Sequence, residues 1–435
     1  MLRAIHWGAP MALALFAAPG MAQLATSAPT SLSVQPPSSP AATAAAIDRF
    51  YASRSGPPLW LEGGRPSAAA RVLLDRLRTA NLDGMPEGPA LAVRIDTLLA
   101  SPQTAPAADW QMSSAYLALA ERLHGPVPGL TYVDAAARPH VEPADRMLYL
   151  AGQSTLLAAH VGAVLRMSRL YEELRAATLA DAARRGGAVD PRLLANLVRA
   201  RALPSTGRYL VVNPAAAELL MVENGEVSDR MRVVVGTPQT PTAPQASVIS
   251  YATVNPYWNV PEDLVQKIIA PRIVSQGLSY LKRARYEPVD SFGPDAKVIP
   301  PESIDWKAVK AGTASVKLRQ LPGPYNSMGR VKFGFPNPYG IYLHDTSNKP
   351  QFAKAARATS NGCVRLEDAP RLARWLLGRD PLAAGGAGDQ NLLLPRPVPI
   401  YITYLTAQPG AGGALNWAND VYALDVTAAT RLSSK

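Results

Sequence analysis

The spacing of apolar residues divides the chain into a helical first half and a β-rich second half. From residue 46 to 200 apolar positions recur at helical spacing, and Ser67 can cap the first clear helix. Its apolar face carries Ala69, Val72, Leu73, Leu77 and Ala80. The segments 110–123 and 156–179 repeat this pattern, and 147–165 is apolar enough to predict one core helix. We therefore expect an all-helical domain over 46–200.

After residue 200 the pattern changes to short runs rich in β-branched and aromatic residues. Asn224-Gly225 lies between two of these runs and supplies a two-residue hairpin turn that requires positive φ. The predicted strands are 209–213, 219–222, 231–235, 247–254, 340–344 and 398–405. These strands predict a mainly β domain over 201–425.

The segment from 256 to about 325 does not follow the strand pattern. It contains helical stretches such as 262–274 and many lysines and arginines. Long insertions of this kind usually form lids or substrate-facing elements, although a plain stabilising excursion is the alternative. The predicted fold class is therefore α+β: an all-helical domain, then a mainly β domain that carries a helical or irregular capping insertion.

The first residues have the composition of an export signal. Arg3 gives a positive start, the apolar run 9–19 follows, and Gly20-Met21-Ala22 offers small residues for cleavage. This predicts a signal peptide over 1–22 that is too short to span a bilayer, and hence an exported, periplasmic protein. A Pro- and Ser-rich linker is expected over 23–45 and a short tail over 426–435.

Composition limits the partners and cofactors. The chain has 435 residues, a formal net charge of +11 and a single cysteine, so an internal disulfide is excluded. A basic protein outside the cytoplasm suits a carboxylate-rich cell-wall polymer or an anionic lipid, and we expect no nucleic acid partner. His124, His140 and His160 lack metal-ligand spacing and are expected to be structural or surface residues. No ligand cluster or phosphate loop is present, which predicts neither metal nor nucleotide cofactor.

The single cysteine, Cys363, lies in the segment Ser360-Asn361-Gly362-Cys363-Val364-Arg365. The apolar spacing after it predicts a helix, so we expect the cysteine in a turn that leads into a helix N-terminus. That N-terminus, Arg357 and Arg365 would each favour the thiolate and lower the thiol pKa. An unpaired thiol in an exported protein is then expected to be reactive.

His344 is the candidate base for this thiol. In the predicted strand 340–344, Ile341 and Leu343 face the core while Tyr342 and His344 face the other side. A cysteine nucleophile needs such a base and donors for the oxyanion, which the N–H groups of Cys363 and of Gly362 or Asn361 can supply. Asp345 can orient the imidazole through its backbone carbonyl or its side chain. The alternative is that the cysteine and histidine are both packing residues.

These segments resemble a known family. His344-Asp345-Thr346 followed by the segment 360–365 is similar to the signature of the L,D-transpeptidase (YkuD) catalytic domain. A second set of segments resembles the longer members of this family, which have a helical scaffold and a capping insertion. These segments are 255–261, Met328-Gly329, Lys332-Phe333, Asn337 and Arg357. The resemblance covers most of residues 46–425.

The resemblance implies an enzyme whose substrates are peptidoglycan stem peptides. Cys363 would attack the carbonyl of an L-residue that precedes a D-residue, and His344 would act as base. Arg365 and Arg357 would bind substrate carboxylate, Ser360 and Asn361 would contact substrate, and Tyr342 and Trp258 would line the cleft under the cap. Carbapenem-type inhibitors would acylate the same thiol.

Two departures from the family pattern leave alternatives open. Many short members have histidine where Asn361 stands, and the stretch from 175 to 205 has no room for the peptidoglycan-binding module that long members commonly carry. Products with 3,3 or 1,3 cross-links both remain possible, as do carboxypeptidase activity and lipoprotein anchoring at the same site. A non-catalytic cell-wall-binding protein is the alternative from another class.

Overall fold

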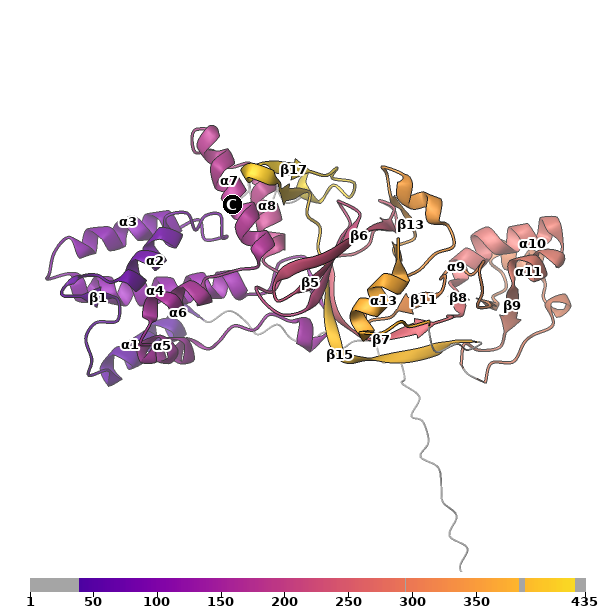
Figure 1. The fold of residues 1–435 in the computed structure, drawn as a ribbon, viewed down its shortest axis with the longest axis horizontal. Helices are drawn as coiled ribbons and strands as arrows, with labels where there is room; N and C mark the ends of the chain where they lie inside the picture. The colour runs from indigo at the N-terminus through magenta and orange to yellow at the C-terminus, as the bar shows by residue number, and fades with distance from the viewer. Residues whose placement is uncertain (1–38, 294, 383–387, 427–435) are drawn as a thin grey trace, which may run out of the picture.

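The protein is elongated, with helices at one end, a β-rich body in the middle and a cap at the other end (Figure 1). The computed structural model describes residues 39–293, 295–382 and 388–426. The predicted signal peptide, most of the linker and nearly all of the tail lie outside these ranges. Within them, no helix is both long and apolar enough to cross a membrane.

The helical part begins earlier than predicted. Helix α1 starts at Pro40, where the Ser39 side chain accepts a hydrogen bond from the Ala42 N–H, so the linker prediction for 40–45 was wrong. Ser67 caps α2 as predicted. The single core helix expected over 147–165 is instead two helices, α5 and α6. The helices are α1 (Pro40–Ser53), α2 (Ala68–Leu77), α3 (Gly88–Leu99), α4 (Ala105–His124), α5 (Ala144–Gln153), α6 (Leu157–Val164), α7 (Arg169–Arg184) and α8 (Pro191–Ala200).

A buried carboxylate ties two segments of this helical part together. Asp83 is fully buried and accepts hydrogen bonds from Arg76, Arg175 and the Tyr171 hydroxyl. It thereby joins the loop after α2 to α7. Charged groups are tolerated in a core only when paired in this way, so the cluster fixes the packing of these helices.

The β-rich body is a sheet that closes into a ring. Its strands follow the order β11-β12-β14-β6-β5-β4-β15-β7, and a further pairing of β7 with β11 closes the ring. The strands are β4 (Tyr209–Asn213), β5 (Glu218–Glu223), β6 (Glu226–Gly236), β7 (Gln245–Val254), β11 (Val331–Phe333), β12 (Leu343–His344), β13 (Ala358–Ser360), β14 (Val364–Leu366) and β15 (Gln390–Ile402). The apolar core inside the ring also receives helix α13 (Ala369–Leu377).

Several strand predictions are confirmed and two change in length. Asn224 and Gly225 have φ values of 54° and 81°, as the predicted hairpin turn between β5 and β6 requires. The strand predicted over 340–344 is reduced to Leu343–His344, although Ile341 and Leu343 face the core as expected. The strand predicted over 398–405 begins much earlier, at Gln390.

The capping insertion has its own core and its own sheet. Strands β8 (Trp258–Val260), β9 (Tyr286–Val289) and β10 (Lys317–Gln320) form a three-stranded sheet, which the sequence pattern did not predict, beside the expected helical stretches. Its helical elements are α9 (Glu262–Leu264), η2 (Val265–Ile269), α10 (Ala270–Gln276), α11 (Ser279–Ala284) and α12 (Trp306–Ala311). Asn326 closes the neck of the insertion by donating to the carbonyls of Pro256, Gln320 and Leu321.

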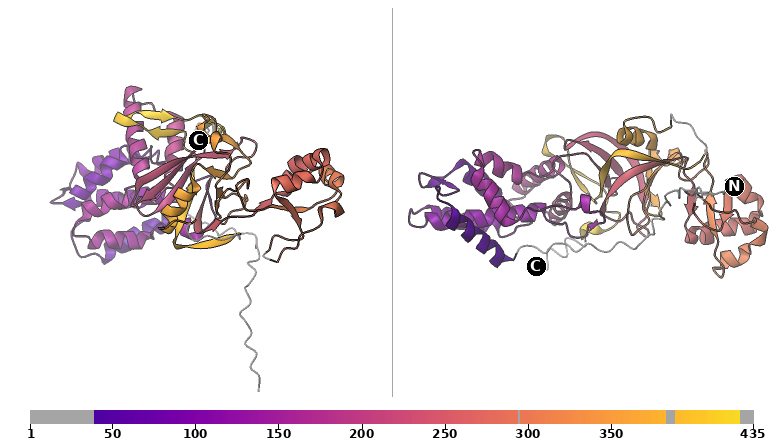
Figure 2. Two further views of the ribbon diagram at one scale, coloured as in Figure 1. Left: turned by 45° about the vertical axis from the view of Figure 1, so that its right-hand side comes forward. Right: turned by 90° about the horizontal axis from the view of Figure 1, so that it is seen from below.

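The helical and β-rich parts are interleaved in sequence. Strand β3 (Thr131–Tyr132), from the helical half, extends the sheet by pairing in parallel with β7. In return the C-terminal strands β16 (Ala407–Pro409) and β17 (Leu415–Trp417) lie beside α7 and α8 (Figure 2). The predicted boundary at residue 200 is therefore crossed by two contacts, that of β3 with the sheet and that of the C-terminal strands with α7 and α8.

Candidate active site

Two adjacent parallel strands place the predicted base and nucleophile on one face of the sheet. In β12 and β14, Leu343 pairs with Val364 and His344 pairs with Arg365. Leu343 and Val364 are fully buried in the core, so His344 and Arg365 point to the outer face. Cys363 lies two residues before Arg365 on the same strand line, and alternation places its side chain on that outer face too. Tyr342 contacts both groups, since its ring centroid lies 5.8 Å from that of His344 and its hydroxyl hydrogen-bonds the thiol.

His344 is held as a neutral base. Its imidazole is 3% exposed, and its Nδ1 lies 2.5 Å from the backbone carbonyl oxygen of Asp345. Because a carbonyl can only accept, Nδ1 carries the proton and Nε2 is left as the basic nitrogen. Burial lowers the His344 pKa to about 4, and the charge of Arg365 lowers it further. The carbonyl of Asp345, and not its side chain, therefore orients the imidazole.

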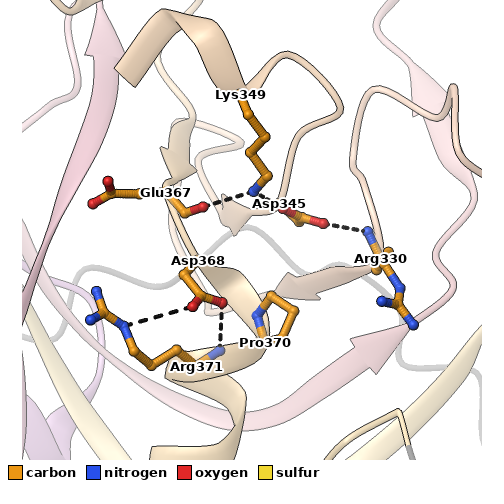
Figure 3. A pocket seen from close by; sticks show the side chains of 7 residues that line it. All are labelled: Arg330, Asp345, Lys349, Glu367, Asp368, Pro370 and Arg371. Carbon is orange, nitrogen blue, oxygen red and sulfur yellow. Dashed lines mark hydrogen bonds and ion pairs between the residues drawn. The ribbon is translucent and has the colours of Figure 1, made fainter. Parts of the chain in front are cut away.

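The Asp345 carboxylate has a separate role on the other side of this peptide. It accepts hydrogen bonds from the Arg330 N–H at 2.9 Å and from Lys349 Nζ at 2.6 Å, at the wall of a cavity of about 530 Å³ (Figure 3). A Cβ at Gly329 would lie 2.4 Å from this carboxylate. The side chain thus fixes the backbone segment whose carbonyl holds His344.

Cys363 is less acidic than the sequence predicts. Its Sγ donates to the Gly340 carbonyl at 3.7 Å, and burial raises the pKa of the thiol. Hydrogen bonds from Tyr342 and the charges of Arg365 and Lys332 oppose this effect but do not reverse it. The predicted helix N-terminus is absent because β14 follows the cysteine, and α13 begins only at Ala369 with Asp368 as its cap. The expectation of a lowered pKa was therefore wrong, and the thiol depends on a base.

The turn before Cys363 is shaped by its own hydrogen bonds. Ser360 is 2% exposed; its hydroxyl donates to the Cys363 carbonyl at 2.6 Å and accepts from the Gly362 N–H at 3.2 Å. The Ser360 hydroxyl is thus used within its own turn, so its predicted contact with substrate stays a prediction, and the Gly362 N–H already has an acceptor. The N–H groups of Cys363 and Asn361 donate to no other described residue. Gly362 has φ 110°, a conformation that favours glycine.

A buried threonine behind this turn was not predicted. Thr242 is fully buried; its hydroxyl donates to the Gly362 carbonyl at 2.7 Å and accepts from the Gly236 N–H at 2.9 Å. The Tyr422 hydroxyl donates to the Gly236 carbonyl at 2.8 Å and accepts from the Thr242 N–H at 3.2 Å. No local sequence pattern marks Thr242 or Tyr422, because the contacts join segments far apart in the chain.

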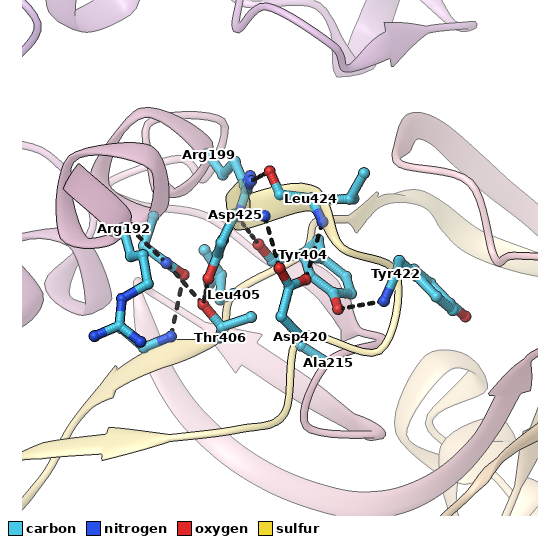
Figure 4. A network of polar contacts seen from close by, with 12 residues as sticks. Arg192, Arg199, Ala215, Tyr404, Leu405, Thr406, Asp420, Tyr422, Leu424 and Asp425 are labelled. Atoms are coloured by element: carbon cyan, nitrogen blue, oxygen red, sulfur yellow. Dashed lines mark hydrogen bonds and ion pairs between the residues drawn. The ribbon is translucent and has the colours of Figure 1, made fainter. Parts of the chain in front are cut away.

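The C-terminal segment connects this support to the helical part (Figure 4). The Tyr422 N–H donates to the Tyr404 hydroxyl at 3.0 Å, and the two rings stack. Arg199 of α8 donates to the Leu424 carbonyl at 2.8 Å and pairs with Asp425. The turn before Cys363 is therefore anchored, through the C-terminal segment, on the helical half of the chain.

The remaining predicted substrate contacts differ in their surroundings. Arg365 lies on the outer face and donates to Gln351 at 3.0 Å, whereas Arg357 donates to four backbone carbonyls, Val233, Lys354, Ala216 and Ala217. The guanidinium of Arg357 is therefore engaged within the fold, and its predicted contact with substrate stays a prediction. Trp258 belongs to the cap core but hydrogen-bonds the Tyr342 hydroxyl, which itself contacts Cys363. Asn361 is exposed at the tip of the turn.

Comparisons with known proteins show which families the two halves of the chain match. Residues 207–400 match the family model for the L,D-transpeptidase catalytic domain (YkuD), and residues 45–177 match the Scaffold domain. A Haemophilus influenzae protein named "Putative L,D-transpeptidase" is 27% identical over 394 residues, which cover 87% of this chain and 78% of that protein. An L,D-transpeptidase structure from Mycobacterium smegmatis is 14% identical, covering 46% of this chain and 59% of its own. Its TM-score of 0.22 is too low to establish a shared fold.

Proposed function

Because the chain joins a Scaffold domain to a YkuD L,D-transpeptidase catalytic domain, we propose that it cross-links peptidoglycan through an acyl-enzyme on Cys363. One observation carries this proposal: a buried neutral imidazole with its Nδ1 fixed on a carbonyl lies on the same outer face as the only thiol. This is the pairing that a cysteine acyltransferase needs. Export to the periplasm, the compartment of that polymer, belongs to the same proposal.

In the acylation step His344 Nε2 takes the thiol proton while Sγ attacks the carbonyl carbon of an L-residue. The Cys363 N–H is the candidate donor to the oxyanion that forms. The C–N bond to the following D-residue then breaks, the leaving amine takes the proton from His344, and a thioester remains on Cys363. No metal or cofactor enters this step.

In the transfer step an amine of a second stem peptide attacks the thioester. His344 takes the proton that this amine loses and returns it to the thiolate as the C–S bond breaks. The product is a new amide bond, which is a 3,3 link when the donor was cut after diaminopimelate and a 1,3 link when it was cut after L-alanine. Water as acceptor would make the protein a carboxypeptidase, and a lysine acceptor would anchor a lipoprotein.

Acylation by a carbapenem tests the nucleophile directly. Intact mass of the folded protein should show one β-lactam adduct in the wild type and none in Cys363→Ala. An unmodified wild-type protein would favour the rival, a cell-wall-binding protein that keeps an unreactive thiol. Muropeptide analysis of sacculi treated with the two proteins then identifies the bond that is cut. Equal cross-linking by both would remove Cys363 from the mechanism.

A further inference from the structure

A row of polar side chains crosses the outer face of the sheet at the level of His344. The strand registers pair Asn391 with Thr253, Thr253 with Lys332, Lys332 with His344, and His344 with Arg365. Directly paired residues on neighbouring strands share a face, so all five side chains lie on the face opposite the core. Their neighbours along the strands confirm this, since the core contains Ala252, Val254, Val331, Phe333, Leu343, Val364 and Leu366.

Two cations of this row flank the imidazole, and neither forms an ion pair with a carboxylate in the part of the chain that the structure describes. Lys332 is half-buried, and its Nζ lies over the Tyr342 ring, 5.7 Å from the ring centroid. Arg365 is half-buried too and bonds only the neutral Gln351. The exposed carboxylate of Asp389 lies near enough to Lys332 to interact with it electrostatically.

This arrangement is unfavourable for the free protein. Both cations disfavour a protonated His344, the form that the reaction must pass through, and partial burial of an unpaired charge costs free energy. An arriving anion would offset both effects. The row therefore has the character of a binding site for a ligand that brings carboxylate groups to each side of the imidazole.

The proposed substrate has a carboxylate in the required place. At both L-to-D junctions of a stem peptide, the nitrogen that leaves is attached to a D-centre that also bears a free α-carboxylate. D-alanine does so at the end of the stem, and D-glutamate does so because it continues through its γ-carboxyl. His344 must reach this nitrogen to protonate it, so the carboxylate one carbon away lies beside the imidazole. Strands are about 4.8 Å apart, which places the Lys332 strand next to that point.

We propose that Lys332 binds the α-carboxylate of the D-amino acid unit whose nitrogen leaves during acylation and attacks during transfer. This proposal rests on the proposed transpeptidase function and adds a specificity determinant to it. Arg365, on the opposite side of His344, is left for the side-chain carboxylate of diaminopimelate when that residue donates the acyl group. Because leaving and attacking amines occupy the same place, one lysine serves both half-reactions.

The test compares two acceptors in an exchange assay with a stem tetrapeptide donor. D-alanine carries the carboxylate and D-alaninamide lacks it, so the ratio of their kcat/KM values measures carboxylate recognition. A charge-assisted hydrogen bond predicts that Lys332→Met lowers kcat/KM for D-alanine by about 10- to 100-fold and leaves D-alaninamide within about threefold. Lys332→Arg should keep most of the preference. Lys307→Met, on the exposed side of cap helix α12, is the matched charge control and should behave as wild type.

The outcomes separate this inference from the proposed function. If the wild type is not acylated by a carbapenem, both fail together. Three results on a protein that is acylated would overturn only the role of Lys332. Lys332→Met could keep the preference for D-alanine over D-alaninamide, or it could lower kcat/KM equally for both acceptors. The wild type could also show no preference. Loss of the preference in Arg365→Met instead would assign the carboxylate to the arginine and likewise overturn the proposal.

Discussion

Replacing Thr242 by valine removes the support of the turn before Cys363 without changing its shape. The hydroxyl that is lost accepts from the Gly236 N–H and donates to the Gly362 carbonyl, at 2.9 and 2.7 Å. Thr242 is fully buried, so water cannot replace either bond in the folded protein. Valine has the same branching and nearly the same volume, and the change is therefore confined to these two hydrogen bonds.

The magnitude follows from the two groups that are left unsatisfied. Each buried backbone group without a partner costs about 1–3 kcal/mol, so Thr242→Val should lower the free energy of unfolding by about 2–6 kcal/mol. That is a large part of the 5–15 kcal/mol typical of a whole domain, so the turn is expected to relax locally before the protein unfolds. Relaxation moves the Cys363 N–H and thiol relative to His344, and acylation should slow by on the order of 10²-fold.

Urea unfolding and the rate of carbapenem acylation measure the two effects. Thr178→Val is the matched control, because Thr178 is also fully buried. Its hydroxyl donates to the Leu174 carbonyl within helix α7, and that carbonyl keeps its backbone hydrogen bond in the helix when the hydroxyl is removed. We expect that control to lose less than about 1 kcal/mol and to acylate normally. The reasoning is refuted if Thr242→Val matches Thr178→Val in both measurements.

Three further changes test the base, its support and the helical core. Because burial holds the His344 pKa at about 4, below its unfolded value, the stability it contributes is complete above pH 6.5 and lost as pH falls through 4. In the wild type this group should make the free energy of unfolding about 3 kcal/mol larger at pH 6.5 than at pH 4, and His344→Gln should remove that difference in urea unfolding. The same pH profile in both proteins would contradict the lowered pKa of His344. Gly329 has φ 60° and faces the Asp345 carboxylate, so the Cβ of Gly329→Ala should displace that carboxylate and lower kcat at least about tenfold. A thiol-reactive probe should still label Cys363. An unchanged kcat would show that the Asp345 side chain does not position His344. Asp83→Asn should cost about 3–5 kcal/mol in thermal or urea unfolding, against less than about 1 kcal/mol for the exposed Asp96→Asn, and equal effects would show that the buried cluster is not stabilising.

Local patterns in the sequence predicted many of the elements and the side of the strand at His344 that faces the core. The period of two around His344 correctly placed Ile341 and Leu343 in the core, and Ser67 and Asn224-Gly225 acted as their chemistry predicts. The pKa of Cys363 was predicted with the wrong sign because the helix dipole was assumed to act on it. A three-residue strand intervenes, and burial then dominates.

Features that depend on long-range pairing could not be predicted. Ser360 and Arg357 have the chemistry of substrate-binding groups, but the first is used by its own turn and the second by carbonyls of β6 and the β4–β5 turn. Lys332 could not be connected with His344 from the sequence, because only the pairing of β11 with β12 places the two residues side by side. Thr242 likewise becomes important only when the fold brings it against the turn at Gly362.

The electrostatics of the site indicate how substrate binding and proton transfer are linked. Burial raises the pKa of Cys363 and lowers that of His344, so the free protein holds a neutral thiol and a neutral imidazole. Transfer of the thiol proton is uphill in that state, which protects the cysteine while the cleft is empty. In the proposed reaction, a carboxylate of the stem peptide beside Lys332 or Arg365 would offset the positive field on the imidazole, and His344 would then accept the proton more readily. Formation of the imidazolium, which both cations disfavour in the free protein, would thus depend on bound substrate.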